Sequence, residues 1–267
     1  MLPMNILDQI IAYKREEVLR NREKIDTKTL ESFLWFDRPT LSLAQALRKP
    51  EASGIIAEFK RQSPSKGVIN GQANATLTTQ GYQEAGASGI SVLTDTPSFG
   101  GSDEDLMLSR KQVGIPMLRK DFIVDEYQLV EAKAIGADVI LLIAACLSPT
   151  EVRRLAQFAK SLHLEVLLEL HSAEELAHIC PEVDLVGVNN RDLRSFMVSI
   201  EHSLSLAAHI PPEFVKVSES GLSKPETILS LKEAGFQGFL IGETFMRQER
   251  PAEACASLIG QLKQGVS

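Results

Sequence analysis

Short apolar segments alternate with amphipathic segments along the chain after residue 53. Continuous apolar runs of this length are typical of parallel strands that are covered on both faces. The expected strands are Ile55–Phe59, Ile90–Leu93, Pro116–Leu118, Val139–Ala144, Val166–Leu170, Leu185–Val188, Val215–Val217 and Phe239–Ile241. Helical spacing of apolar residues follows each strand, in Leu77–Ala85, Asp105–Val113, Glu126–Ile135, Pro149–Leu162, Ala173–Ile179, Ile200–Ala208, Pro225–Ala234 and Ala252–Leu262.

Strands that alternate regularly with helices predict an α/β protein, and this number of pairs predicts a (β/α)8 TIM barrel. The runner-up is an open, doubly wound sheet, but no G-x-G-x-x-G follows a strand. We expect residues 1–267 to form a single barrel domain, of which 1–50 is an N-terminal helical extension. In the extension, residues 5–22 predict a helix with Asn5 as its N-cap, and shorter helices are expected at Leu30–Phe36 and Leu41–Leu47.

Composition narrows the class of function. The chain has 28 Lys and Arg against 35 Asp and Glu, a net charge of −7, which argues against general nucleic-acid binding. Its longest strongly apolar run, Val139–Leu147, is far shorter than the ~20 residues of a membrane helix, and no basic leader precedes it. Three cysteines without C-x-x-C spacing are expected to be buried, reduced thiols: Cys146, Cys180 and Cys255. We therefore expect a cytoplasmic protein.

Polar residues cluster where the expected strands end. In a barrel these ends meet at one mouth, which carries the chemistry. The candidates are Glu58, Lys60, Lys120, Glu169, Asn189, Arg191 and Glu219. Glu58 and Lys60 are two residues apart and so share a face of their strand. Alone they could form a structural ion pair, but the other charges that converge on the same mouth favour a catalytic site.

Small residues at the last two strand ends predict a phosphate site. Ser220, Gly221 and Gly242 would let backbone N–H groups approach an oxyanion, and the side chain of Glu243 must then point away. The segment Ser63–Gly67 lacks the P-loop frame and is interpreted as a lid over the mouth. No histidine pair has metal-ligand spacing, so we expect no metal, and His171 is interpreted as a solvated loop residue.

Several strings identify a resemblance that runs over nearly the whole chain. They are E-F-K-R-Q-S-P-S-K-G from Glu58, S-V-L-T-D from Ser91, K-D-F-I from Lys120, G-V-N-N-R-D-L from Gly187 and S-E-S-G from Ser218, after an N-terminal stretch at Asn5–Glu17. In this order they resemble the indole-3-glycerol-phosphate synthases. That family closes the indole ring of 1-(2-carboxyphenylamino)-1-deoxyribulose 5-phosphate, releases CO₂ and water, and needs no cofactor.

The resemblance also implies roles. Lys120 resembles the general acid, Lys60 the cation near the substrate carboxylate and carbonyl, and Glu169 the carboxylate of the dehydration, with Glu58 close by. The remaining roles are positioning by Asn189 and Glu219, carboxylate binding by Arg191, aromatic walls from Phe99 and Phe122, and substrate or phosphate binding by Ser63, Ser220, Gly221, Gly242 and Glu243. A monomer or weak homo-oligomer is expected, with association with other tryptophan-pathway enzymes as a further possibility.

Two loops depart from the family pattern. Residues 68–75 lack the Arg and Asp-Pro that commonly follow Gly67, and residues 96–102 keep only Phe99 of two aromatic positions. Two alternatives remain: another phosphate-binding barrel enzyme, such as a phosphoribosylanthranilate isomerase, and a non-catalytic, ligand-binding barrel. The Glu58–Lys60 pair and Lys120-Asp121-Phe122 argue against the isomerase, and the intact set of catalytic residues argues against a non-catalytic barrel.

Overall fold

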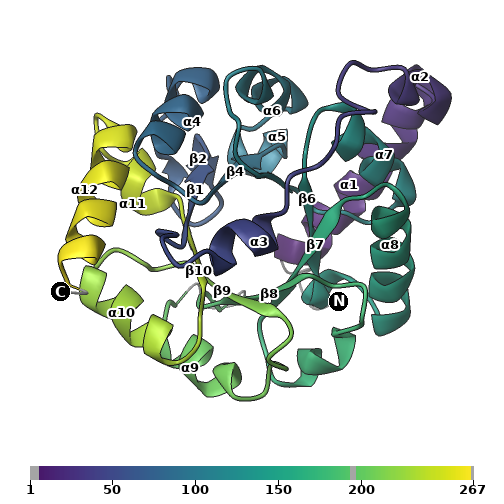
Figure 1. Ribbon diagram of the computed structural model, residues 1–267. Helices are drawn as coiled ribbons and strands as arrows, with labels where there is room; N and C mark the ends of the chain where they lie inside the picture. The colour runs from purple at the N-terminus through teal and green to yellow at the C-terminus, as the bar shows by residue number, and fades with distance from the viewer. Residues whose placement is uncertain (1–5, 193–196, 266–267) are drawn as a thin grey trace.

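A closed barrel of parallel strands, surrounded by helices, forms the centre of the protein (Figure 1). The computed structural model describes residues 6–192 and 197–265. Around the barrel the strand order is β1-β10-β9-β8-β7-β6-β5-β4, which confirms the predicted TIM barrel. The strands are β1 Ile55–Phe59, β4 Gly89–Leu93, β5 Met117–Lys120, β6 Val139–Ile143, β7 Glu165–Leu170, β8 Leu185–Asn189, β9 Val215–Glu219 and β10 Gly238–Ile241. Every predicted strand is present, with ends that shift by two residues at most.

Helices follow the strands as the periodicity predicts, with one correction. They are α4 Ala75–Glu84, α6 Asp103–Arg110, α7 Glu126–Ala134, α8 Pro149–Ser161, α9 Glu201–Ala207, α10 Pro225–Glu233 and α12 Pro251–Gln264. The helix expected at Ala173–Ile179 is instead the 3-10 turn η2, Glu174–His178. Its N-cap position, Ala173, has no side chain that could cap the free N–H groups of an α-helix.

Several short elements were not predicted, because each is too short to show a periodic pattern of apolar residues. They are the hairpin strands β2 Gln62–Ser63 and β3 Gly67–Val68, the helices α5 Thr96–Phe99 and α11 Glu243–Met246, and the turn η1 Ala144–Cys146. The hairpin occupies the segment that was interpreted as a lid. Cys180 and Cys255 are buried as expected, whereas Cys146 is only partly buried, because it ends η1 rather than a strand.

The sequence places Gly86, Gly114, Gly136 and Gly235 just after expected helices, where C-terminal caps belong, and three of the four adopt the left-handed backbone conformation. Gly86, Gly136 and Gly235 have φ of 92°, 97° and 92°, immediately after α4, α7 and α10. The prediction for Gly114 is wrong. It does not have a positive φ, because α6 already ends at Arg110 and an ordinary turn follows.

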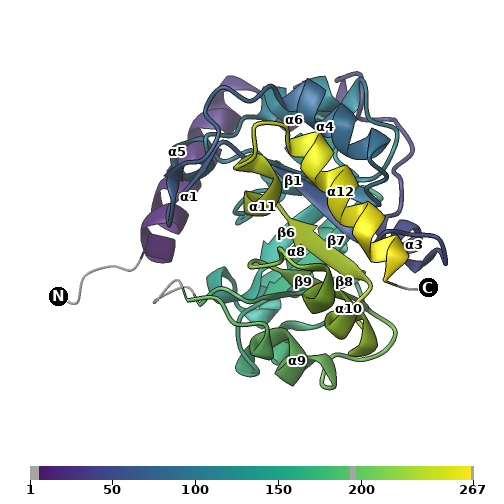
Figure 2. The same cartoon turned by 90° about the vertical axis from the view of Figure 1, so that its left-hand side faces the viewer.

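Helices of the N-terminal segment lie at the two ends of the barrel. They are α1 Ile6–Lys24, α2 Thr27–Glu31 and α3 Leu43–Arg48. In Figure 2 the first turn of α1 and α3 lie on opposite sides of the barrel. The predicted cap Asn5 lies outside the described residues, and the helix expected at Leu30–Phe36 is wrong beyond Glu31, where turns follow.

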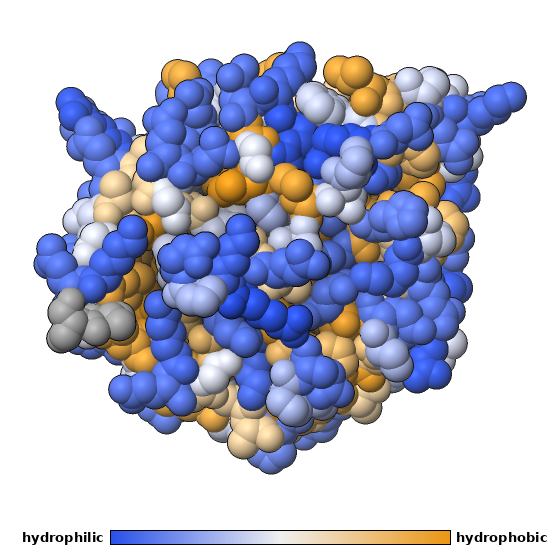
Figure 3. All heavy atoms as spheres, viewed as in Figure 1, coloured by the Kyte–Doolittle hydropathy of each residue, from blue (hydrophilic) through white to orange (hydrophobic). Residues whose placement is uncertain are grey.

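The short helix α3 closes the end of the barrel at which the strands begin. Its Leu43 and Leu47 are buried among inward-facing strand residues. A Cβ on Gly89 would lie 2.5 Å from Leu43 Cδ1, so a larger residue at the start of β4 would force Leu43 to shift. Around α3, mostly hydrophilic side chains cover this face of the molecule (Figure 3). Within the described ranges, no helix is both long and apolar enough to span a membrane.

A buried carboxylate, Asp138, connects the elements at this closed end. Its Oδ1 lies 2.5 Å from Arg38 Nη2, and its Oδ2 lies 2.8 Å from Arg110 Nη1. It also accepts the backbone N–H of Leu41 and of Met117, each at 2.8 Å. The side chain of Asp138 is fully buried, so it links the N-terminal segment to α6 and to the start of β5.

The Asp138→Asn variant should unfold more easily and retain its catalytic constants. Removal of the charge leaves the buried Arg110 guanidinium without its carboxylate, at a cost of about 3–5 kcal/mol. Urea unfolding of the variant and the parent protein measures this difference. A loss below about 1 kcal/mol would contradict the importance given to Asp138.

Candidate active site

Strand period places the functional side chains inside the barrel. Ile56, which faces the barrel interior, is followed on the same face by Glu58 and then Lys60. In the same way, the inward-facing Leu118 of β5 is followed two residues later by Lys120, and the inward-facing Leu167 of β7 by Glu169. Each strand therefore changes from apolar to charged as it reaches the mouth.

One pocket at this mouth contains every site residue predicted from the sequence. The catalytic candidates that line it are Glu58, Lys60, Lys120, Glu169, Asn189 and Glu219. The binding candidates that line it are Ser63, Phe99, Phe122, Arg191, Ser220, Gly221, Gly242 and Glu243. Residues scattered from strand β1 to helix α11 are thus brought together by the closure of the barrel.

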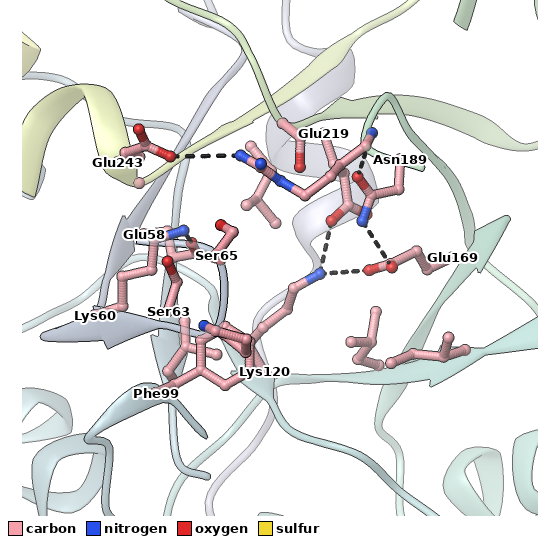
Figure 4. A pocket seen from close by; sticks show the side chains of 18 of the residues that line it. Glu58, Lys60, Ser63, Ser65, Phe99, Lys120, Glu169, Asn189, Glu219 and Glu243 are labelled. Atoms are coloured by element: carbon pink, nitrogen blue, oxygen red, sulfur yellow. Dashed lines mark hydrogen bonds and ion pairs between the residues drawn. The ribbon is translucent and has the colours of Figure 1, made fainter. Parts of the chain in front are cut away.

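Lys120 is at the centre of the pocket, between two carboxylates (Figure 4). Its Nζ lies 2.6 Å from Glu169 Oε2 and 2.6 Å from Glu219 Oε2. Asn189 Nδ2 donates to Glu169 Oε1 at 2.9 Å, which orients that carboxylate. A Cβ on Gly187 would lie 2.3 Å from Glu219 Oε1, so a glycine in β8 makes room for Glu219.

Burial and charge together set the protonation of these groups. Burial disfavours the charged amine of Lys120, but Glu169 and Glu219 outweigh it and raise the pKa of Lys120. Burial likewise opposes the charge of Glu169, yet Lys120 and His171 hold its pKa well below the ordinary value. Burial raises the pKa of Glu219 to about 7, against the attraction of Lys120 and with the repulsion of Glu169. The site therefore holds the charged ammonium group of Lys120, the carboxylate of Glu169, which stays ionised, and the carboxyl of Glu219, whose pKa is about 7.

The second lysine of the pocket forms its own pair. Lys60 Nζ lies 2.7 Å from Glu58 Oε1, and the side chain of Glu58 is almost entirely buried. A Cβ on Gly242 would lie 2.4 Å from Glu58 Oε1, so a larger residue at the end of β10 would have to displace the Glu58 carboxylate. The predicted shared face of Glu58 and Lys60 is confirmed.

Aromatic and aliphatic side chains form one wall of the pocket. The ring centroids of Phe99 and Phe122 lie 6.2 Å apart, with their planes inclined by 36°. Ile6, Leu7 and Ile10 of α1 line the same pocket. The N-terminal extension is therefore part of the site. Its sequence shows only an amphipathic helix, so this contribution was not predicted.

Two consecutive residues after β9 have a positive φ. Ser220 and Gly221 have φ of 70° and 73°, a backbone conformation that serine rarely adopts. Gly242 and Glu243 form the neighbouring turn into α11. The carboxylate of Glu243 is 3.4 Å from Arg191 Nη2.

Some buried polar atoms at the pocket have no hydrogen-bond partner among the described residues. They include Ser63 Oγ and Glu219 Oε1. Because buried polar groups are nearly always satisfied, such atoms indicate where a polar ligand would bind. Within the described part of the chain, no group of three or more His, Cys, Asp or Glu side chains could hold a metal ion.

The interpretation of His171 as a solvated loop residue is wrong. Only 8% of its side chain is exposed, and Nε2 lies 3.1 Å from Glu169 Oε1. Burial opposes protonation of His171, but the charges of Glu169 and Glu175 raise its pKa. The signal was present in the sequence, because His171 continues the inward parity of Leu167 and Glu169 beyond the end of β7.

Glu219→Gln should change the pH dependence of stability. A carboxyl whose folded pKa is about 7, above its unfolded value, stabilises the fold at low pH and loses that contribution as pH rises through 7. The stability of the variant relative to the parent should therefore increase between pH 5 and pH 8. Urea unfolding at both values measures it, and a constant difference would refute the raised pKa.

Comparison with known proteins agrees with this site. The profile of the indole-3-glycerol phosphate synthase family matches residues 7–258. The chain is 48% identical to the indole-3-glycerol phosphate synthase of Bacteroides thetaiotaomicron over 96% of this chain and 98% of that protein. It is 44% identical to the protein of that name from Salinibacter ruber, over 98% and 97% of the two chains. From its motifs, its barrel and these likenesses, the chain belongs to the indole-3-glycerol phosphate synthase family.

Proposed function

We propose that this pocket converts 1-(2-carboxyphenylamino)-1-deoxyribulose 5-phosphate into indole-3-glycerol phosphate, CO₂ and water. The observation that carries the proposal is the position of Lys120, which holds its charge between Glu169 and Glu219 beside two aromatic rings. The enzymes of this family are carboxy-lyases of tryptophan biosynthesis. The roles of individual residues are those that the family resemblance implies, and the geometry of the pocket supports them.

Lys120 supplies the acid for ring closure. The aryl carbon that bears the carboxylate attacks the ketone carbon, and the ketone oxygen takes a proton from Lys120 Nζ as the new C–C bond forms. Loss of CO₂ then returns the bonding electrons to the ring. Because its two carboxylate partners raise the pKa of Lys120, the amine is protonated before the substrate binds.

Glu169 serves the dehydration that completes the indole. The new hydroxyl gains a proton and its C–O bond breaks to release water, while the neighbouring carbon gives up a proton and the C=C bond of the indole forms. A carboxylate held by Asn189 and by Lys120 is well placed to take that proton. Glu219 and Asn189 position Lys120 and Glu169, and the Glu58 carboxylate lies on the same inward face of the barrel.

The cations and small residues bind the ends of the substrate. Lys60 and Arg191 are each paired with a carboxylate, Glu58 and Glu243, so an anionic substrate competes for them. We assign the substrate carboxylate to Lys60 and Arg191. The aromatic ring lies against Phe99 and Phe122, and the phosphate is bound by Ser220, Gly221, Gly242 and the backbone of Glu243, with Ser63 at the entrance.

The direct test is a fluorescence time course of the purified protein with the carboxyphenylamino-deoxyribulose phosphate and EDTA present. Indole emission should grow in proportion to enzyme, and one CO₂ should appear per indole. A flat trace with measurable substrate binding would favour the non-catalytic barrel. A flat trace without binding would mean that the substrate is wrong.

Lys120→Met should lower kcat at least a hundredfold, the lower end of what a general acid contributes. The substrate should still bind through its ring and phosphate, so its dissociation constant should change much less. Steady-state kinetics and equilibrium titration separate these effects. If kcat stays near the parent value and only KM rises, Lys120 is a binding residue and not the acid.

A further inference from the structure

A lysine occupies the centre of the buried face of α1. The buried residues of this helix are Ile10, Lys14 and Val18, at the four-residue spacing of one helix stripe. The side chain of Lys14 is fully buried. A charge placed among apolar residues costs free energy unless it is paired, so its partners decide what it does.

Two of these partners come from loops at the mouth of the barrel. Lys14 Nζ lies 2.9 Å from Asp95 Oδ1 and 2.9 Å from Asp121 Oδ1. Both carboxylates are buried. The third partner, Glu17 Oε1 at 2.8 Å, is on α1 itself. Burial opposes the charge of Lys14, but Asp121 and Asp95 raise the pKa of its amine, so the ion pairs persist at neutral pH.

Asp95 controls the helix that carries Phe99. It is the N-cap of α5, where its Oδ2 accepts the backbone N–H of Ser98 at 2.9 Å. Tyr13, the neighbour of Lys14, donates its hydroxyl to Asp95 Oδ1 at 2.8 Å and lies 3.0 Å from Ser98 Oγ. The first pocket ring is thus attached to α1 through one carboxylate.

Asp121 controls the loop that carries Phe122. Its Oδ1 accepts the backbone N–H of Phe122 at 2.8 Å, and its Oδ2 accepts the hydroxyl of Thr94 at 2.6 Å. Arg119 Nη2 approaches the same oxygen at 3.4 Å. The second pocket ring is therefore attached to α1 through the other carboxylate.

We propose that Lys14 is a positioning residue that sets the relative position of Phe99 and Phe122, and with it the wall against which the substrate's aromatic ring lies. This inference rests on the proposed function only in taking the ligand to be aromatic. One ammonium group joins the two loops, because its two bonds end on the residues that cap α5 and precede Phe122. Removal of the amine leaves the hydrogen bond from Thr94 to Asp121 between the two loops, but it takes away the cation that holds Asp95 and Asp121 at a fixed distance from α1.

The amine of Lys120 does not depend on this connection. It is held from the barrel side by Glu169 and Glu219, on β7 and β9. Loss of Lys14 should therefore disturb the binding of the ring more than the chemical steps. A lysine that only docks α1 would affect stability and leave both kinetic constants unchanged below the melting temperature.

Lys14→Met tests this difference. We expect KM to rise at least tenfold while kcat stays within about threefold. Amide hydrogen exchange of residues 94–101 and 120–124 should accelerate, as well as that of α1. The matched control is Asp138→Asn, which breaks a buried ion-pair cluster at the opposite end of the barrel and should leave KM unchanged. A Lys14→Met protein with the parent KM, or with faster exchange in α1 alone, would overturn the proposal.

A double variant separates positioning from stability. Lys14→Met leaves the buried carboxylates of Asp95 and Asp121 without the cation that they share. Lys14→Met with Asp95→Asn removes one of these charges and keeps a competent N-cap for α5. We expect this variant to recover thermal stability but not the parent KM. Recovery of both together would show that the effect on KM was only a loss of folded protein.

A milder variant tests the proposal if Lys14→Met does not fold. Tyr13→Phe removes only the hydroxyl that binds Asp95, and it should raise KM about two- to fivefold with kcat unchanged. No change in KM or in the exchange of residues 94–101 would contradict the proposal. The exchange experiments need no substrate, so they test Lys14 even if the parent protein makes no indole, a result that would refute the proposed function alone.

Discussion

The pairing of one buried ammonium group, Lys120, with two carboxylates is the interaction on which the mouth of this barrel depends. Glu58, Lys120, Glu169 and Glu219 come from β1, β5, β7 and β9, which are alternate strands around the barrel. Alternate strands contribute the side chains of one layer in such barrels. Here the uppermost layer is charged rather than apolar. It is stable because each group has a partner, and the cost of burial reappears as a raised pKa at Glu219.

This arrangement explains how a protein with a net charge of −7 can take an anionic ligand. The cations Lys60, Lys120 and Arg191 are all held by carboxylates inside the pocket. They are oriented before a substrate arrives, so little conformational entropy is lost on binding. The attraction is local and short-ranged, and in the proposed binding mode the ligand replaces a carboxylate rather than fills an empty positive site.

The two ends of the barrel use buried charge differently. At the closed end, Asp138 joins two arginines and two backbone amides, and no pocket residue takes part. At the mouth, Lys14 joins two loops that each carry a pocket ring. The N-terminal segment contributes to both ends, through Arg38 and α3 at one and α1 at the other. Although the N-terminal segment precedes the barrel in the sequence, it therefore contributes both to stability and to the shape of the site.

Periodicity and motifs by themselves determined the fold and the polar residues at the strand ends that line the pocket, but not the part of the pocket that α1 supplies. Strand parity is a local property, which is why Glu58 and Lys60 could be assigned to one face from their spacing alone. Partners were not accessible in this way. Lys14 reads as one charge among several on an amphipathic helix, and its carboxylates are 81 and 107 residues further along the chain. His171 was misjudged because whether a loop residue is buried depends on what the closed barrel places around it. Only the tertiary structure decides which charges meet, since burial and pairing arise from contacts between distant segments.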